Sequence, residues 1–561
     1  MASMKIIATI GPACSDPETL KGMVRAGLNN VRINTAHIEK GYITKIRKMV
    51  DQVNEETKAS VGIMVDLKGP ELRTRAYDGG RMEIKAGNTY RFSDDESDPR
   101  NIGVNYLNVI DTLEPGDLIL VSDGKITLRV VQKSGNTVEV KALDSGVIRD
   151  RGRINIPGKV LNLGVTTERD ELFIKEGIEA GVEFFALSFV QTRENVEELQ
   201  ELVMSQGGDQ LIVSKIETKS GLQNISDISR VSDFIMVARG DLGVEMPLEE
   251  VIVAQKQIIR ESHKHGVPTI VATQVLESMV SNPVPTRAEV SDVTNAILDN
   301  ADVLMLSEET AIGKYPVESV EYLKNISEYV ERSYGNFAGP EEFLGNRIAY
   351  SIAMAARVVA SEIRAAGILA FTQSGNTAKM LSAVRPPCPV YAVTTNPKMP
   401  ARLSLYRDVI PLYIPQEEGQ KLTQLNALEW LLEKGMFEKG SRLVITSGAP
   451  YFLFGGTNEV RIATVGRFIG RGYPCGKSTD GVVTRNIDGT GDVLITDSLS
   501  ERDMDRYGKF RCVVCTSSVP HRLLRELTSR GVTVLSNTRL AGDVKEGDHV
   551  TVDGDTGVIN G

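Results

Sequence analysis

Two short segments place acidic and basic side chains at the ends of apolar runs. The segment SKIE carries Lys215 and Glu217, and MVARGDLGVE carries Asp241 directly after another apolar run. Alternating residues of a strand point to the same side, so Lys215 and Glu217 would share one face. Two carboxylates from neighbouring strands can hold Mg2+ or Mn2+ and still leave positions for substrate and water. The pattern therefore predicts a divalent metal site.

Three cationic side chains accompany these carboxylates. Lys215 offers a compact positive charge, and Arg32 and Arg73 offer planar guanidinium groups that match phosphate. Phosphoryl transfer is catalysed mainly by positioning and by spreading negative charge over cations. The set as a whole predicts an anionic, phosphorylated substrate, whereas any single pair could equally be an ordinary salt bridge at the rim of a barrel.

The elements that must position these groups are eight short apolar runs, most of them followed by a helical pattern. Eight strand and helix units predict a (β/α)8 barrel of the α/β class, whose active site lies at the carboxyl ends of the strands. The runs begin at Lys5, Asn29, Gly62, Glu183, Gln210, Asp233, Pro268 and Ala301. Their polar ends are Asn34, Asp66, Ser188, Glu217, Asp241, Thr273 and Ser307.

The rest of the chain predicts further domains. Residues 71–157 interrupt the barrel (1–70 and 158–335) with β-rich segments and Gly-Asp or Gly-Asn turns, which indicates a small β domain acting as a lid. Residues 336–466 read as a helix and four strand candidates of an α/β regulatory domain. Residues 467–561 form an extra α/β domain.

Composition limits the function classes. The net charge of -10 argues against a general nucleic-acid binder, because phosphate backbones attract basic surfaces. No apolar run reaches the length of a membrane span or resembles a signal peptide, and the five cysteines are scattered. We therefore expect a cytoplasmic protein without nucleic-acid or membrane partners. The C-x-x-C of Cys512 and Cys515 is better explained as strand core than as a redox or metal motif.

Eight sequence strings resemble those of the pyruvate kinase family in order and spacing. The strings are KIIATIGPA, VRIN, DLKGPELRT, SKIE, MVARGDLGVE, ATQVLESM, PTRAEVSDV and LSEETAIGKYP, and the resemblance covers roughly residues 5–466. It implies a glycolytic homotetramer that transfers the phosphoryl group of phosphoenolpyruvate to ADP, giving pyruvate and ATP.

The resemblance also implies roles for the strand-end residues. Glu217 and Asp241 would hold the divalent metal, Lys215 would stabilise the phosphoryl group and the enolate oxygen, and Arg32 would bind the phosphate. The Gly240 backbone would approach the substrate carboxylate, and Asp241 and Thr273 would also belong to the substrate-binding set with Arg32 and Lys215. The proton for the enolate carbon would come through Thr273, with Ser307 acting through water, and the nucleotide would be bound by Arg73, His37 and Arg151.

Two regulatory sites follow from the same resemblance. Potassium would bind Asn34, Asp66 and the Leu67 carbonyl, with weakened affinity because Ala36 stands where the family has a hydroxyl; Glu71 matches the potassium-dependent members. A phosphorylated effector would bind the turn formed by Ser374, Gly375, Asn376 and Thr377. The loop Ser447 to Asn458 lacks Lys and Arg, which favours a monophosphate. Nothing in the sequence explains Glu308, which replaces the family's glycine.

The last segment resembles the swivelling phosphohistidine domain of phosphoenolpyruvate-using enzymes. His521 falls at the place of the phosphorylated histidine, but Ser517, Ser518, Val519 and Pro520 replace most of the family's turn. We expect a packing or assembly domain in which His521 is not phosphorylated.

Two other function classes stay open from the residues alone. A metal-dependent aldolase or lyase of pyruvate-like substrates could use the same carboxylates but would not need the lid. A non-catalytic metabolite-binding relative would have no reason to keep Arg32, Lys215, Glu217, Asp241 and Thr273 together.

Overall fold

The computed structural model describes residues 4–77, 79–93, 101–106, 108–122, 124–135, 137–335, 337–416, 424–448, 457–466, 468–541 and 544–561. The chain divides into two compact units. The first comprises Met1–Ala353, Ser374–Arg385 and Asn396–Leu412, and the second comprises Met354–Gln373, Pro386–Thr395 and Tyr413–Gly561.

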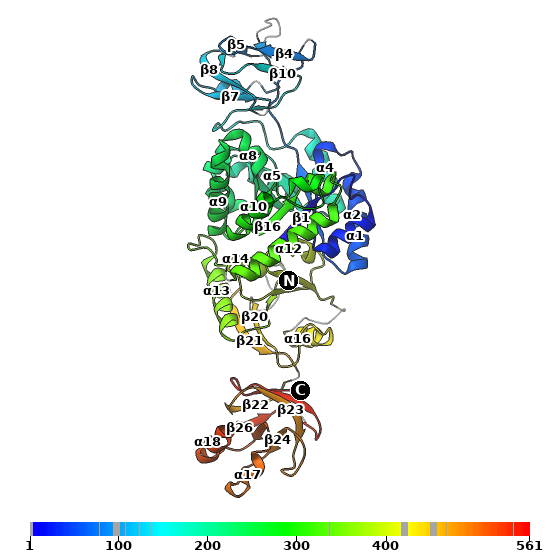
Figure 1. Ribbon diagram of the computed structural model, residues 1–561, viewed down its shortest axis with the longest axis vertical. Coiled ribbons are helices and arrows are strands. Elements are labelled where there is room, and N and C mark those ends of the chain that lie inside the picture. Colours follow the sequence, from blue (N-terminus) through cyan, green and yellow to red (C-terminus); the bar gives the residue numbers. More distant parts are fainter. Residues whose placement is uncertain are drawn as a thin grey trace. The chain divides into compact units, whose positions relative to one another are not determined.

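Eight parallel strands close into a barrel in the first unit (Figure 1). Around the barrel the order is β1-β16-β15-β14-β13-β12-β3-β2. The strands are β1 (Lys5–Thr9), β2 (Asn30–Asn34), β3 (Gly62–Leu67), β12 (Phe184–Leu187), β13 (Leu211–Ile216), β14 (Phe234–Ala238), β15 (Thr269–Ala272) and β16 (Val303–Leu306). They coincide with the eight apolar runs, which confirms the predicted barrel.

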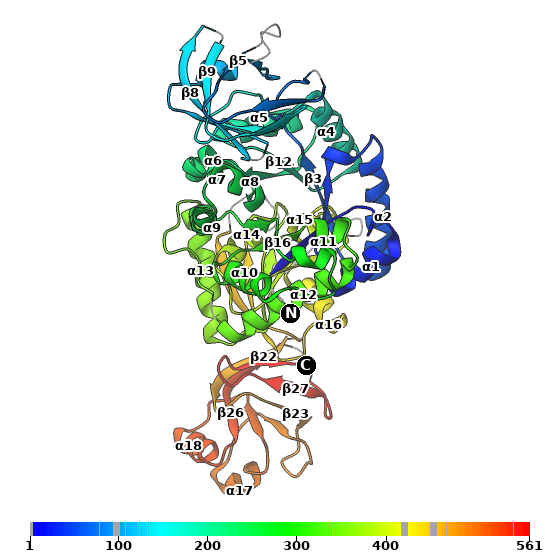
Figure 2. The same ribbon diagram turned by 45° about the horizontal axis from the view of Figure 1, so that its top comes forward.

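Local sequence explains the helices that surround these strands (Figure 2). Before α1 (Pro17–Ala26), Asp16 accepts a hydrogen bond from the Thr19 amide, and Pro17 suits the first helical position. Capping boxes start α4 (Glu168–Ala180), α5 (Arg193–Ser205) and α10 (Arg287–Leu298). Further helices of the barrel are α2 (Tyr42–Thr57), α9 (Leu248–Lys264) and α12 (Pro316–Tyr334).

A buried charge cluster stabilises the amino-terminal end of the barrel. Asp302, which precedes β16, pairs with Arg385 at 2.7 Å and His263 at 2.8 Å and accepts a hydrogen bond from the Thr269 amide. Burial opposes ionisation, but Arg385 and His263 outweigh it and hold the pKa of Asp302 well below its usual range. Since the chemistry of such barrels lies at the other end of the strands, this cluster serves stability.

The segment inserted after β3 forms two antiparallel-rich sheets with a core of their own, including Phe92, Ile119 and Leu128. One sheet pairs β4 (Arg81–Ile84) with β10 (Gly146–Arg149). The other has the order β11-β7-β8-β9-β5-β6. Its strands are β5 (Thr89–Phe92), β6 (Asn101–Ile102), β7 (Leu118–Val121), β8 (Ile126–Ser134), β9 (Thr137–Ala142) and β11 (Ile154–Asn155). The predicted inserted β domain is therefore present.

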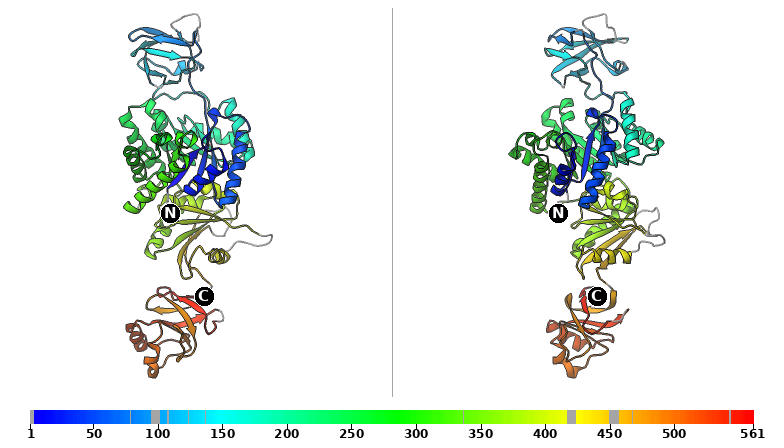
Figure 3. Two further views of the ribbon diagram at one scale, coloured as in Figure 1. Left: turned by 45° about the vertical axis from the view of Figure 1, so that its right-hand side comes forward. Right: turned by 90° about the vertical axis from the view of Figure 1, so that its right-hand side faces the viewer.

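A five-stranded sheet follows the barrel in the chain (Figure 3). Its order is β19-β18-β17-β20-β21, with β17 (Gly367–Phe371), β18 (Val390–Thr394), β19 (Val409–Tyr413), β20 (Arg442–Ser447) and β21 (Glu459–Thr464). Four of these strands were predicted, and β21 was missed. The helices are α13 (Arg347–Glu362), α14 (Asn376–Ala383), α15 (Met399–Leu403) and α16 (Gln424–Glu433). Most of the predicted effector loop, residues 449–456, lies outside the described residues.

The last segment forms a second closed barrel, of seven strands, with the order β22-β26-β25-β24-β23-β27-β28 (Figure 3). Its strands are β22 (Phe468–Cys475), β23 (Thr479–Thr484), β24 (Val493–Thr496), β25 (Cys512–Cys515), β26 (Thr533–Leu540), β27 (His549–Val552) and β28 (Val558–Asn560). The two cysteines of β25 are free and buried, as expected of strand core. Within the described part of the chain, no helix is long and apolar enough to cross a membrane.

Candidate active site at the carboxyl ends of the barrel strands

The strand ends bring the predicted charged residues together around one buried carboxylate. Asp66 of β3 is only 2% exposed. Its Oδ2 accepts hydrogen bonds from Arg32 of β2 (Nε at 2.7 Å and Nη2 at 2.6 Å), and its Oδ1 lies 3.0 Å from Nζ of Lys215 on β13. An isolated buried carboxylate would be very costly, so the two cations are the condition for placing Asp66 there. Asp66 in turn fixes both cations.

Lys215 has two further partners. Its Nζ lies 2.9 Å from Oε1 of Glu217 and donates to the Ser188 hydroxyl at 2.7 Å, and that hydroxyl donates to the Leu67 carbonyl at 2.8 Å. Burial disfavours the charged lysine, but Asp66 and Glu217 outweigh it and raise the pKa of Lys215 above its ordinary value. Lys215 is therefore a fixed positive charge at the mouth of the barrel.

Glu217 and Asp241 are near enough for the charge of Asp241 to act on the Glu217 carboxyl. Burial raises the pKa of Glu217 to about 7; Lys215 opposes this shift, and the charge of Asp241 adds to it. The Glu217 Oε2 also accepts a hydrogen bond from the Phe189 amide at 2.9 Å. A cation between the two carboxylates would relieve their repulsion, which is what a divalent metal ion does.

The donor set fits Mg2+ or Mn2+. Within the described residues, no group of three or more His, Cys, Asp and Glu side chains gathers as a metal site. Mg2+ is usually bound by only one or two carboxylates and completes its shell with water and substrate oxygens. Two neighbouring carboxylates beside cationic phosphate-binding groups therefore suit this ion better than a metal that needs a full protein cage.

Arg153 is a member of the site that the sequence analysis missed. It precedes β11, and its Nη1 pairs with Oδ1 of Asp241 at 2.7 Å while its guanidinium lies 5.2 Å from the Phe189 ring centroid. The inserted domain thus reaches one of the two carboxylates predicted to bind the metal through an arginine. The only signal in the sequence was a basic residue near the point where the chain returns to the barrel.

The residues predicted for proton transfer lie at the ends of β15 and β16. The Thr273 hydroxyl accepts a hydrogen bond from the Gly240 amide at 2.9 Å, at the start of α8 (Arg239–Glu245). The Ser307 hydroxyl is buried without a hydrogen-bond partner among the described residues. Buried Glu309, also missed, accepts from the Ser307 amide and so fixes this turn, whereas Glu308 is exposed and nothing in the structure explains it.

The residues predicted for the nucleotide are only partly brought together. Arg73 donates through Nε and Nη2 to Glu71 and through Nη1 to the Arg151 carbonyl at 2.8 Å. The Arg151 side chain itself is exposed. His37 is exposed at the end of η1 (Thr35–His37). The predicted cluster is thus a fixed Arg73 beside Glu71, with two side chains that lie in solvent.

The predicted potassium ligands come from neighbouring strands. Asn34 and Asp66 are registered partners across β2 and β3. The Asn34 Oδ1 accepts a hydrogen bond from the Ala36 amide, and the Leu67 carbonyl accepts one from Ser188. A potassium ion at this site would bind oxygen atoms that already accept hydrogen bonds.

The predicted effector turn lies at the start of α14. Gly375, at φ 87°, is the N-cap, and the side chains of Ser374 and Asn376 are exposed.

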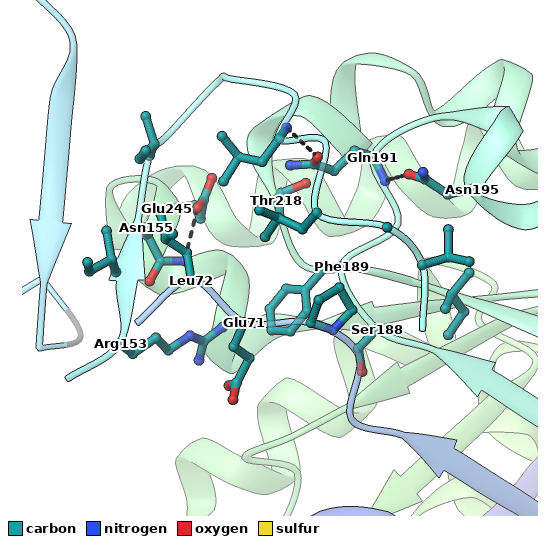
Figure 4. Close-up of a pocket in the computed structure, with 18 residues that line it drawn as sticks. Glu71, Leu72, Arg153, Asn155, Ser188, Phe189, Gln191, Asn195, Thr218 and Glu245 are labelled. Atoms are coloured by element: carbon teal, nitrogen blue, oxygen red, sulfur yellow. Dashed lines mark hydrogen bonds between the residues drawn. The ribbon is translucent and has the colours of Figure 1, made fainter. Parts of the chain in front are cut away.

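A pocket adjoins the array (Figure 4). Arg153, Ser188 and Phe189 line it, and Asn155 donates to Glu245 at 3.0 Å within it. Its lining mixes apolar residues with polar and charged ones in nearly equal number, and the close pairs of Asp66, Arg32, Lys215 and Glu217 lie at the strand ends. The chemistry therefore belongs to the array and not to this pocket.

Comparisons with known proteins agree on one family. A family model described as "Pyruvate kinase, barrel domain" matches residues 1–320, and one described as "Pyruvate kinase, alpha/beta domain" matches residues 350–463. A pyruvate kinase of Thermoplasma acidophilum is 49% identical over 555 residues, which cover 99% of this chain and 98% of that protein. One of Thermotoga maritima is 39% identical over 83% of this chain and 100% of its own length.

A solved structure supports the same assignment. The crystal structure of a pyruvate kinase from Cryptosporidium parvum has a TM-score of 0.73 and 30% sequence identity, and the match covers 82% of this chain and 96% of that one. A pyruvate kinase of Sporosarcina psychrophila is 36% identical over 100% of this chain. The relatives thus differ in whether they match the whole chain or about five sixths of it.

We expect Asp241→Asn to weaken Mn2+ binding by at least about 10–100-fold. Loss of a group that only supports a metal ligand already costs this much, and Asp241 is predicted to be a ligand itself. Glu217→Gln should have a similar effect, because each removes the charge of one of two ligands. The measurement is a titration of free Mn2+ by electron paramagnetic resonance. The control is Glu245→Gln, which changes the buried carboxylate at the end of α8 that accepts a hydrogen bond from Asn155. Unchanged Mn2+ affinity in Asp241→Asn would contradict the assignment.

Proposed function

The chain belongs to the pyruvate kinase family and transfers the phosphoryl group of phosphoenolpyruvate to ADP, and we propose how its strand-end residues divide that work. The observation that supports the assignment is the buried array of Asp66, Arg32, Lys215 and Glu217, in which every charge has a partner within 3.0 Å. Such an array is preorganised, because its charges need not move when negative charge develops on the substrate.

Arg32 and Lys215 neutralise the phosphoryl group from two sides. Asp66 holds both, so their spacing is fixed before substrate arrives. Lys215 also faces the position where the enolate oxygen forms, and its raised pKa keeps it charged there. Glu217 and Asp241 would hold the divalent cation, which supplies further positive charge to the phosphoryl and enolate oxygens when bound.

Protonation of the enolate carbon is the task of Thr273, with Ser307 acting through water. The Gly240 amide, which contacts the Thr273 hydroxyl, also offers a donor to the substrate carboxylate. A Cβ at position 240 would meet the Thr273 hydroxyl in ordinary contact, at 3.5 Å, so the glycine serves the approach of the substrate to the backbone and not the packing of the protein itself. The Ser307 hydroxyl, which has no hydrogen-bond partner among the described residues, can hold a water molecule.

Arg73, His37 and Arg151 bind the nucleotide under the lid. Glu71 fixes Arg73, and closure of the lid would bring the exposed Arg151 and His37 to the phosphates and base. Lid closure excludes water, which would otherwise take the phosphoryl group.

We assign four domains to the chain. They comprise residues 1–70 together with 158–335, residues 71–157, residues 336–466 and residues 467–561. The seven-stranded barrel of the last domain supports its kinship with the swivelling phosphohistidine domain, although His521 is exposed at the start of α18 (His521–Ser529) without the parent turn. We further propose a cytoplasmic homotetramer. Exposed apolar residues of α9, including Leu248 and Val253, offer a surface for such assembly.

Lys215→Met is expected to lower kcat by roughly 100–1,000-fold, the usual cost of losing one preorganised charge stabiliser. Phosphoenolpyruvate binding should stay measurable, because Arg32 and the metal carboxylates remain. The assay is pyruvate formation from phosphoenolpyruvate, ADP and Mg2+. Lys219→Met, an exposed lysine four residues on, is the control and should be near normal. Near-normal turnover in Lys215→Met would refute the role.

Potassium is expected to activate the enzyme with weak affinity, since Asn34, Asp66 and the Leu67 carbonyl remain but Ala36 supplies no hydroxyl. The variant Ala36→Ser should lower the potassium concentration for half-maximal rate. The measurement is rate against potassium at constant ionic strength. Equal activity with a bulky organic cation in place of potassium would show that the site is not used.

An effector with a single phosphate is expected to outperform a bisphosphate, because the turn Ser374 to Thr377 offers one cradle at the start of α14. Dose-response curves with sugar and nucleotide monophosphates and with fructose bisphosphate provide the test. Ser374→Asp, which adds a negative charge at the cradle, should abolish the response. A stronger response to fructose bisphosphate than to every monophosphate would be inconsistent with this site.

Removal of residues 467–561 is expected to lower the melting temperature or change the oligomer while leaving kcat largely intact. The variant His521→Ala should be as active as wild type, with the adjacent exposed Arg522→Ala as control. Acid-labile phosphate on His521 after incubation with phosphoenolpyruvate would instead mean that the domain has kept the chemistry of its relatives.

A further inference from the structure

Two consecutive residues at the end of β15 hold a backbone conformation that is costly for their side chains. Thr273 has φ 64° and Gln274 has φ 53°, both in the left-handed region. That region is unfavourable for residues other than glycine and most of all for a β-branched residue such as threonine. Strain of this kind persists only where surrounding contacts impose it, and it concentrates at functional sites.

The contacts that impose it come from Arg239, at the end of β14. Its Nη2 donates to the Thr273 carbonyl at 2.8 Å and to the Gln274 carbonyl at 2.9 Å, and its Nε donates to the Thr273 carbonyl at 3.3 Å. One guanidinium therefore binds both carbonyls of the strained pair. The planar, five-donor geometry of arginine makes this possible, and lysine could not reproduce it fully.

Arg239 is itself anchored by a carboxylate from a distant part of the chain. Its Nη1 pairs at 2.6 Å with Oδ2 of Asp292 on α10, and Arg239 is only 7% exposed. Asp292 neutralises the buried charge and fixes the direction of the guanidinium. The arginine of the MVARGDLGVE string thus binds α10 and the turn after β15, whereas Asp241, two residues later, pairs with Arg153.

The result is a fixed position for the Thr273 hydroxyl. This hydroxyl accepts a hydrogen bond from the Gly240 amide at 2.9 Å and donates to the Ala272 carbonyl at 2.6 Å. Residues 239 and 240 therefore hold Thr273 at two points, its carbonyl and its hydroxyl. Without the hydrogen bonds from Arg239 to its carbonyl, Thr273 would relax to a negative φ, and its hydroxyl would move away from the Gly240 amide.

We propose that Arg239, anchored by Asp292, is a positioning residue for the proton-transfer step, acting through the strained turn that aims the Thr273 hydroxyl. The inference rests on the proposed role of Thr273. In that step a proton leaves the hydroxyl for the enolate carbon, the new C–H bond takes the enolate π electrons as the pyruvate carbonyl forms, and solvent water returns a proton to Thr273. Arg239 touches none of the reacting atoms.

The test compares proton transfer with substrate and metal binding in Arg239→Met. Proton transfer is measured as enzyme-catalysed incorporation of solvent deuterium into the methyl group of pyruvate, followed by NMR. We expect a loss of about 100-fold, as a misplacement of about 1 Å can cost. The KM for phosphoenolpyruvate and the Mn2+ affinity should change by less than about threefold, because the hydrogen bonds of Arg239 go to Asp292 and to two backbone carbonyls and not to the phosphate-binding or metal-binding side chains. Asp292→Asn should show a smaller loss, and Arg239→Lys should recover part of the activity.

Two controls separate positioning from general damage. Arg47→Met removes another buried barrel pair, with Glu183 at 3.1 Å, and should leave deuterium exchange near normal even if it lowers the melting temperature. Adding Arg239→Met to Thr273→Val should lower exchange little further, since both changes act on one hydroxyl.

The possible outcomes are distinct. Loss of exchange in Thr273→Val with normal exchange in Arg239→Met would overturn this proposal and leave the role of Thr273 intact. Normal exchange in Thr273→Val would overturn the role of Thr273 and the proposal with it. A loss in Arg239→Met no larger than in Arg47→Met, or one accompanied by an equal loss of Mn2+ affinity, would also overturn the proposal.

Discussion

The charge balance around Asp66 is the constraint on which the rest of the active site depends. A buried carboxylate is tolerated only when cations and hydrogen bonds replace its water, and here Arg32 does so from the neighbouring strand β2 and Lys215 from β13, two strands away on the other side of β3. Lys215 also pairs with the carboxylate of Glu217. It donates a hydrogen bond to the Ser188 hydroxyl, which in turn donates to the Leu67 carbonyl. Each of these groups can be buried as a charge because the others are present. The array is therefore preorganised before substrate binds, which is how a site can stabilise charge that appears only during reaction.

The carboxyl ends of the strands combine this rigidity with strain. Phe189, Thr273 and Gln274 all have positive φ at points where a strand turns into a loop. Each lies beside a charged or polar anchor: the Phe189 amide binds Glu217, and Arg239 binds the other two. The regular strands and the aliphatic core of the barrel stabilise the fold enough to keep these turns in their strained conformation. The amino-terminal end, with its Asp302 cluster, contributes stability without chemistry, so the two ends of one barrel serve different purposes.

Sequence patterns predicted the parts of the molecule that local rules determine. Eight apolar runs with polar ends located every strand of the barrel, because a parallel strand buried on both faces leaves a continuous apolar signature. They also identified Lys215, Glu217 and Asp241 as neighbours. What failed was long-range pairing: nothing local relates Arg153 to Asp241 or Arg239 to Asp292. The edge strand β21 was missed because its exposed, mixed residues lack a clear period.

The central claim is that Asp66 and Lys215 are one electrostatic unit, and a double-mutant cycle on folding stability tests it most directly. Denaturant unfolding would be followed for wild type, Asp66→Asn, Lys215→Met and the double variant. The account predicts that each single change leaves a buried charge with one partner fewer, so that the double variant is destabilised by less than the sum of the two, with a coupling free energy of at least about 1 kcal/mol. Strictly additive losses would contradict it, because they would mean that the two charges do not depend on each other.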